Sequence, residues 1–259
     1  MHVAPQDLRV VRQGELLVRF ATLGPVAYVL AEVPTGGSPG TSLEEPCEQP
    51  HWGLVVDGSV TVATDVQRID IPAGRAFHVP AGSPAHTLQT AGAATIAGFQ
   101  PIEPTVDVSD ARLRDRGFEP AARPVGPTVA PVLAPHKLGA GEIRVDEWRM
   151  SDFVLARVRM GERSGYTTGW CDAPHWGLVT AGRLAIEWEH DVEVLSRGDV
   201  FHCPPGPPGH RIEAADPVTF IDFTPVAAFE GDHRLADWRR RALRGARRSE
   251  RGIAVTALG

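Results

Sequence analysis

Short apolar runs separated by glycine and proline make up most of this 259-residue chain. Residues 26–33 and 153–160 have the length of strands, and each half of the chain closes on a further apolar run, at 94–99 or 218–223. The 27 glycines and 23 prolines are spread between the runs, and helical periodicity is missing inside both halves. This pattern predicts an all-β protein, an antiparallel sandwich or barrel of the jelly-roll kind.

One stretch of the chain, Cys47-Glu-Gln-Pro-His-Trp-Gly-Leu-Val, recurs as Cys171-Asp-Ala-Pro-His-Trp-Gly-Leu-Val. The offset of 124 residues persists without insertion as far as His86 and His210. Such a repeat predicts one structural unit used twice. We therefore expect domains at residues 8–104 and 145–227, a linker at 105–144, and a C-terminal segment at 228–259.

Turn residues divide each copy of the repeat. Residues 54–62 and 178–188 are predicted to be hairpins that turn at Asp57-Gly58 and Ala181-Gly182. Each is followed by a glycine-containing corner and a second short apolar run that ends in His-x-Pro.

Cysteine and histidine recur with equal spacing in the two copies. On a straight strand, residues four apart lie on one face but about 13 Å apart, too far to share an ion whose bonds are about 2.0 to 2.3 Å. A proline directly before each first histidine predicts the bend that brings the groups together. A second histidine follows 35 residues later in both copies. The six candidate ligands are Cys47, His51 and His86 in one half and Cys171, His175 and His210 in the other.

Each half resembles a cupin, and the whole chain resembles a bicupin. The first cupin motif is His-x-His, then three or four residues, an acid, and a glycine about seven residues further on; the second is Pro-x-Gly-x-x-His. Gly58 and Gly182 match the closing glycine, which puts His51 and His175 at the position of the acid. Cys47 and Cys171 then occupy the position of the second histidine in the cupin motif. Glu45 and Gly169 occupy the position of its first histidine.

The second motif is matched by residues 80–86 and 204–210, with one extra residue before the histidine. The resemblance covers about 85 residues of each half and implies two tandem jelly-roll barrels with a metal at the barrel mouth. In bicupins one half often keeps the chemistry while the other degenerates, and here both triads are complete.

Ligand chemistry favours zinc. A thiolate with two imidazoles suits Zn(II) better than manganese or magnesium, which prefer carboxylate oxygen; Fe(II) is the second candidate, and copper and nickel remain open. The competing interpretation is structural, since buried cysteine usually packs as a small hydrophobe and strand histidines are usually hydrogen-bonded to their surroundings.

Several neighbouring residues have weaker claims. Glu45, His78 and His202 are candidates for groups that hydrogen-bond to a metal ligand or transfer protons near the metal. For the two histidines, hydrogen bonding across the sheet is the alternative. Trp52 and Trp176 follow the ligand histidines and so are predicted to pack on the opposite sheet face. Cys203, which has no counterpart in the first half, is predicted to pack in the core.

The C-terminal segment differs from the rest in charge. Residues 229–259 carry +4 and the remainder −10, and residues 232–251 have the spacing of a short helix with an apolar stripe. The arginines are interpreted as a solvated face, with a phosphate contact as a minor alternative. The net charge of −6 gives no case for nucleic-acid binding.

The N-terminal sequence and the three cysteines bear on location. No signal peptide and no apolar run of about 18 residues is evident, so we expect a cytoplasmic protein without membrane segments and without a disulfide framework. A homodimer is possible.

The sequence therefore predicts a metal-dependent bicupin enzyme acting on a small organic molecule. With zinc the reaction would be that of a lyase, isomerase, cyclase or hydrolase, and with iron that of a dioxygenase. The alternative is a non-catalytic cupin, either a sensor of a small molecule or metal or a dimerising scaffold.

Overall fold

A computed structural model describes residues 2–13, 16–24, 26–33, 51–65, 67–79, 85–101, 136–140, 142–150, 153–162, 170–226 and 228. The chain divides into two compact units. The described residues of the N-terminal unit lie between 6 and 101, and those of the C-terminal unit are 2–5 and 136–228. Residues 102–135 lie outside the described residues, as does the predicted C-terminal helix. Of the predicted linker 105–144, residues 136–140 and 143–144 lie in strands of the C-terminal unit.

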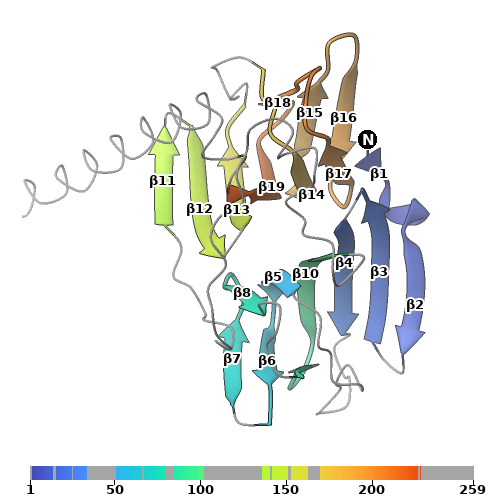
Figure 1. Ribbon diagram of the computed structural model, residues 1–259, viewed down its shortest axis with the longest axis vertical. Coiled ribbons are helices and arrows are strands. Elements are labelled where there is room, and N and C mark those ends of the chain that lie inside the picture. Colours follow the sequence, from blue (N-terminus) through green and yellow to red (C-terminus); the bar gives the residue numbers. More distant parts are fainter. Residues whose placement is uncertain are drawn as a thin grey trace, which may run out of the picture. The chain divides into compact units, whose positions relative to one another are not determined.

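Each unit is a pair of antiparallel sheets. The N-terminal unit has a six-stranded sheet in the order β2-β3-β4-β10-β5-β8 and a three-stranded sheet in the order β7-β6-β9 (Figure 1). Its strands are β2 (Arg9–Gln13), β3 (Leu16–Leu23), β4 (Val26–Val33), β5 (His51–Asp57), β6 (Ser59–Ala63), β7 (Arg68–Pro72), β8 (Ala76–Val79), β9 (Thr87–Gln89) and β10 (Ala94–Pro101).

The C-terminal unit repeats this order and adds one strand. Its larger sheet runs β1-β17-β14-β19-β13-β12-β11, where β1 (His2–Val3) comes from the start of the chain, and its smaller sheet runs β16-β15-β18. The other strands are β11 (His136–Ala140), β12 (Ile143–Met150), β13 (Phe153–Met160), β14 (His175–Ala181), β15 (Arg183–Glu187), β16 (Val192–Ser196), β17 (Val200–Cys203), β18 (Arg211–Ala214) and β19 (Val218–Pro225).

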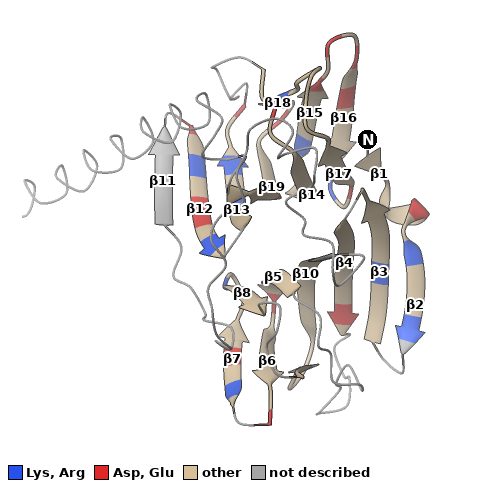
Figure 2. Ribbon diagram, in the orientation of Figure 1, with Lys and Arg blue, Asp and Glu red and all other residues tan. Residues whose placement is uncertain are grey.

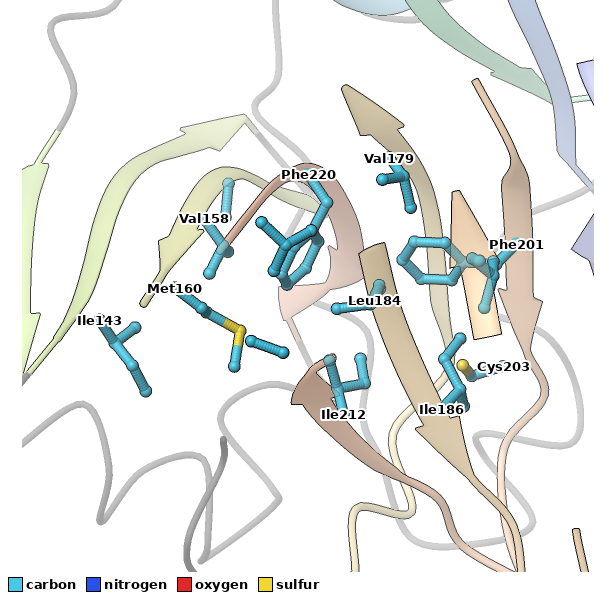
Figure 3. Packing of buried hydrophobic residues seen from close by; sticks show 14 of the residues in the cluster. Ile143, Val158, Met160, Val179, Leu184, Ile186, Phe201, Cys203, Ile212 and Phe220 are labelled. Carbon is cyan, nitrogen blue, oxygen red and sulfur yellow. The ribbon is translucent and has the colours of Figure 1, made fainter. Parts of the chain in front are cut away.

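A single core fills the space between the two sheets of each unit. In the C-terminal unit the larger sheet contributes Val158 and Phe220, and the smaller sheet contributes Leu184, Ile186 and Ile212 (Figure 3). A matching cluster in the N-terminal unit includes residues from β3, β6 and β8. The short 3-10 turn η1 (Pro5–Asp7) and the helical residues Val226 and Ala228 are the helical parts of the described chain. The all-β fold class predicted from the sequence is thus confirmed.

The predicted hairpins at Gly58 and Gly182 are wrong, although both turns exist. Strand β5 pairs with β8 and β10, whereas β6 pairs with β7 and β9, so the chain crosses from the larger to the smaller sheet at Gly58. Gly182 marks the same crossing between β14 and β15. Both glycines have positive φ, +73° and +74°, which a two-residue hairpin turn also uses. The sequence signal of a turn therefore could not tell a hairpin from a crossing between sheets.

The glycine of each Pro-His-Trp-Gly stretch lies beneath an aromatic ring. Gly53 pairs with Phe77, and Gly177 pairs with Phe201. A Cβ built on Gly177 would lie 2.2 Å from the ring of Phe201. The missing side chain therefore lets the ring lie over the neighbouring strand, an arrangement that compensates for glycine in a sheet. No helix among the described residues is long and apolar enough to cross a membrane.

Candidate metal centre

Three predicted ligands of the C-terminal unit come together. The donor atoms of Cys171, His175 and His210 all lie within 4.8 Å of one another. The Cys171 Sγ is 3.3 Å from the His175 Nε2, and the rings of His175 and His210 meet edge to face with centroids 5.0 Å apart. The three residues have exposures of 8%, 2% and 1%, and the Cys171 side chain is the least buried of the three. The cluster therefore lies inside the unit and not on its surface.

The backbone brings the three residues together by a bend and a bridge. Strand β14 begins at His175, so Cys171 precedes the strand, as the proline between them predicted. Cys171 and His210 form an isolated antiparallel bridge, in which the Cys171 amide donates to the His210 carbonyl (2.7 Å) and the His210 amide to the Cys171 carbonyl (2.9 Å). These two hydrogen bonds hold Cys171 and His210 next to His175, the first residue of β14.

The far side of the His175 ring is held by β19. The His175 Nδ1 lies 3.0 and 3.1 Å from the two carboxylate oxygens of Asp222 and 2.7 Å from the Thr224 Oγ1. The Thr224 hydroxyl donates to the Asp222 Oδ2 at 3.2 Å. An ionised carboxylate only accepts hydrogen bonds, so Nδ1 carries a proton, while Nε2 faces the Cys171 Sγ. A histidine that binds metal through one nitrogen usually has its other nitrogen fixed in this way.

The electrostatics favour a cation between these residues. Burial alone lowers the pKa of His175, but the charges of Asp222 and Cys171 and their hydrogen bonds outweigh it and raise that pKa well above the ordinary value. Burial, reinforced by repulsion from His175, lowers the pKa of His210 well below the ordinary value. Neither ring nitrogen of His210 has a hydrogen-bond partner among the residues that the structure describes. Buried nitrogens in this condition are costly unless they bind something.

Asp222 and Thr224 were missed in the sequence, where they lie in an apolar strand. Asp222 pairs with Gly177 across the sheet, two residues beyond His175 and therefore on the same face. A carboxylate in the middle of a buried strand was itself a signal, because unpaired charges are rarely buried. The internal repeat strengthens this signal, because the residue 124 positions earlier is Gly98, which shows that the strand itself does not require a carboxylate at this position.

The N-terminal unit keeps part of this arrangement. The rings of His51 and His86 meet edge to face with centroids 5.2 Å apart, close to the value in the other unit. Cys47 and Glu45 lie outside the described residues. Gly98, which pairs with Gly53, offers no carboxylate, and burial, followed by the charge of His86, lowers the pKa of His51 to about 4. The two units therefore differ in the group that supports the first histidine.

The tryptophans and the remaining histidines occupy the opposite face of each larger sheet. Trp52 pairs with His78 and stacks on it with ring centroids 5.4 Å apart, and Trp176 pairs with His202 and stacks at 5.1 Å. Because neighbouring residues on a strand point to opposite faces, both histidines lie on the face opposite to the His-Cys cluster. Both tryptophans are buried, as predicted.

Cys203 lies on the inner face, opposite His175 in the strand register. It belongs to the apolar core, as predicted, and burial raises the pKa of its thiol well above the ordinary value. Trp188 also packs against this core, and its ring centroid is 5.7 Å from that of His210. The cluster thus has an apolar surrounding on one side and the Asp222–Thr224 pair on the other.

Comparison with solved structures shows the fold. AerE from Microcystis aeruginosa is 10% identical, with a TM-score of 0.64, and the match covers 85% of this chain and 97% of AerE. A variant of oxalate decarboxylase from Bacillus subtilis is 15% identical, with a TM-score of 0.63, and the match covers 86% of this chain and 76% of that enzyme. A further structure of the same enzyme, solved in work on its Mn(II) centres, is 14% identical with a TM-score of 0.62, and the match covers the same two shares.

Both similar proteins have the cupin fold, which is therefore the fold of this chain. At such low identity the likeness shows the fold alone. No protein-family model and no curated protein sequence matches the chain.

Proposed function

We propose that the C-terminal unit binds one divalent metal ion through the Cys171 Sγ, the His175 Nε2 and a ring nitrogen of His210, and that the protein is a metal-dependent enzyme acting on a small organic molecule. The observation that carries the proposal is the convergence of the three donors within 4.8 Å, with the ring of His175 fixed from behind by Asp222. The cupin fold supports it, because cupins commonly hold a metal between the sheets.

The residues fit a transition metal. One thiolate and two imidazoles form the three-ligand set of a catalytic zinc site, which leaves a fourth position for water or substrate. This donor set favours zinc, with iron second, and differs from the carboxylate-rich sites that manganese prefers. The Mn(II) centres of oxalate decarboxylase therefore do not decide the metal of this chain. The anions of Cys171 and Asp222, which raise the pKa of His175, would equally stabilise a bound cation.

Zinc held by Cys171, His175 and His210 would supply a Lewis acid or activate a water, which suits a lyase, isomerase, cyclase or hydrolase; iron would suit a dioxygenase. The chain's own residues set the conditions for that chemistry. Asp222 keeps the proton on the His175 Nδ1 and orients the ring, while the bridge between Cys171 and His210 fixes their spacing. The buried surroundings exclude bulk water and so strengthen each electrostatic interaction.

We further propose that the chain is a bicupin in which the C-terminal unit carries the reaction. The N-terminal unit has the same strand order and the same histidine pair, but Gly98 replaces Asp222. A metal bound by Cys47, His51 and His86 would lack the carboxylate that supports the first histidine. Weaker metal binding is the expected consequence.

The same geometry also suits a second candidate, a metal-free thiol enzyme. The Cys171 Sγ, the His175 ring and the Asp222 carboxylate stand in the order nucleophile, base and orienting acid, with contacts of 3.3 and 3.0 Å. Such an enzyme would carry out acyl transfer through Cys171 and would need no third ligand. Under this alternative the second histidine, His210, has no role, although its ring nitrogens face the cluster without a hydrogen-bond partner among the described residues.

Elemental analysis by mass spectrometry tests the proposal on protein purified without chelator. We expect about one zinc or iron per chain in the wild type, almost none in the Cys171→Ser variant, and an unchanged content in the Cys203→Ala variant, whose cysteine is buried on the same face. Cys47→Ser reports on the N-terminal unit and should lower the metal content little. A metal-free wild type in which iodoacetamide modifies Cys171 rapidly would favour the thiol enzyme instead.

A further inference from the structure

Strand β16 lies at one edge of the smaller sheet in the C-terminal unit (Figure 1). Within the described part of the chain, β15 is its sole neighbour in that sheet. Its outer face carries Val192 and Val194, which are 55% and 50% exposed. The other exposed large apolar side chains of the described residues all lie in the N-terminal unit, and are Val10, Val11 and Val56. An exposed edge strand with apolar side chains is a template for pairing with another strand.

The internal repeat provides a comparison for this edge, because β7 of the N-terminal unit corresponds to β16 at the offset of 124 residues. Arg68 and Asp70 occupy the positions of Val192 and Val194, and Figure 2 shows both charges on β7. Both charged side chains are hydrogen-bonded within their own sheet. Pro72 ends β7, where β16 ends in a serine. Charge and proline are the usual protection of an edge strand, so the fold itself does not require the exposed valines.

The backbone of β16 presents its middle residue to the edge. The Trp188 amide donates to the Asp191 carbonyl at 2.7 Å, which fixes the alternation of hydrogen bonds between β15 and β16. Every second residue from Asp191 therefore bonds to β15, and the amide and carbonyl of Val194 are directed away from it. At the two ends of the edge, the Val192 amide donates to the Asp191 Oδ1 and the Ser196 amide to the Asp199 Oδ2. The position at the centre of the edge is thus the one best suited to pair with a further strand.

The charges that flank β16 are self-complementary. Asp191 directly precedes the strand and Arg197 directly follows it, each three residues from Val194, and both are exposed. An antiparallel pairing of two β16 strands about a twofold axis at Val194 would place each Asp191 opposite the Arg197 of the other copy. Directly opposite residues lie on the same face of a sheet, and opposite charges there stabilise the pair. The corresponding positions beside β7 are Gln67 and Ala73, which carry no charge.

We propose that two copies of the chain associate through β16, antiparallel about a twofold axis at Val194. The two three-stranded sheets then form one continuous six-stranded sheet, with the valines of the two copies side by side on its outer face. The symmetric placement of Asp191 and Arg197 favours a second copy over an unrelated strand as the occupant. Stable interfaces bury about 1,200 to 2,000 Å² in total, and one pair of short strands covers less, so we expect reversible association. The pairing does not depend on a bound metal.

Sedimentation velocity of the full chain over a wide range of concentrations tests the proposal. We expect a monomer–dimer equilibrium in the wild type. Val194→Lys places two like charges directly opposite each other at the twofold axis and should weaken the dimer at least tenfold. The matched control is Val10→Lys, which changes a valine of similar exposure on the edge strand β2 and should leave the equilibrium unchanged. A wild type that is monomeric at every concentration, or a dimer that Val194→Lys leaves intact, would overturn the proposal.

A charge exchange tests the register of the two strands and serves if Val194→Lys does not fold. Asp191→Arg and Arg197→Asp each place like charges opposite one another and should weaken the dimer severalfold. The double variant restores opposite charges in reversed order and should dimerise more tightly than either single variant. Circular dichroism identifies the variants that fold. A folded double variant that dimerises no better than the single variants would overturn the pairing about Val194.

Discussion

Replacing Asp222 by asparagine should weaken metal binding without changing any ligand. The carboxylate accepts from the His175 Nδ1 at 3.0 and 3.1 Å and is 6% exposed, so water cannot substitute for it. An amide keeps one acceptor oxygen but loses the negative charge that favours a cation at Nε2. Loss of such a supporting group typically costs 10- to 100-fold in metal affinity. This corresponds to about 1.4 to 2.8 kcal/mol.

The assay is competition for zinc against a fluorescent chelator of known affinity, at constant pH and salt. The control is Asp216→Asn, which removes an exposed carboxylate paired with Arg183 in the same unit and should leave zinc affinity unchanged. Far-ultraviolet circular dichroism shows whether each variant is folded. A folded Asp222→Asn protein that binds zinc within twofold of the wild type would refute the role assigned to this carboxylate.

Three further substitutions test the N-terminal histidine pair, the buried His78 and the turn at Gly182. Gly98→Asp supplies the missing carboxylate to the N-terminal unit, where a Cβ would have ordinary contacts of 3.4 Å or more; NMR titration should show the pKa of His51 rising from about 4. Burial lowers the pKa of His78 to about 4, so the unfolded chain takes up a proton first as pH falls. The contribution of His78 to the free energy of unfolding, measured with urea, should therefore fall by about 3 kcal/mol between about pH 7 and 4. The variant His78→Phe, which keeps the ring stack, should lack this part of the pH dependence. Gly182 has a φ of +74°, and a Cβ added there would lie 1.9 Å from a backbone carbonyl oxygen, so Gly182→Ala should lower the free energy of unfolding by about 1 to 3 kcal/mol or more. At Gly92 an added Cβ meets nothing within 4 Å, and Gly92→Ala should change the free energy of unfolding by less than about 0.5 kcal/mol.

The internal repeat made most of the fold predictable. Two copies with one spacing define two units, and alternating turns and short apolar runs define strands. What failed was strand pairing at Gly58 and Gly182, because a glycine with positive φ permits a tight turn but does not specify which sheet the next strand joins. Pairing is decided by the core between the sheets, which involves residues far apart in sequence.

The clustering of Cys171, His175 and His210 was predictable from the sequence, but the groups that hold the His175 ring were not. Recurrent spacing identified Cys171, His175 and His210, since a shared offset can be seen without a structure. Asp222 has no carboxylate counterpart in the other copy, where Gly98 stands, so recurrent spacing could not identify it as it identified the three clustered residues. Its contact with His175 depends on strand register across the larger sheet, which the sequence does not specify.

X-ray absorption spectroscopy of the metal-bearing wild type reports the atoms around the ion, and so tests whether Cys171, His175 and His210 bind it. We expect one sulfur at about 2.3 Å, two imidazole nitrogens at about 2.0 to 2.1 Å, and one further light atom. The sulfur contribution should disappear in any metal retained by Cys171→Ser. A wild-type spectrum without sulfur, or with only oxygen neighbours, would contradict a centre built from Cys171, His175 and His210.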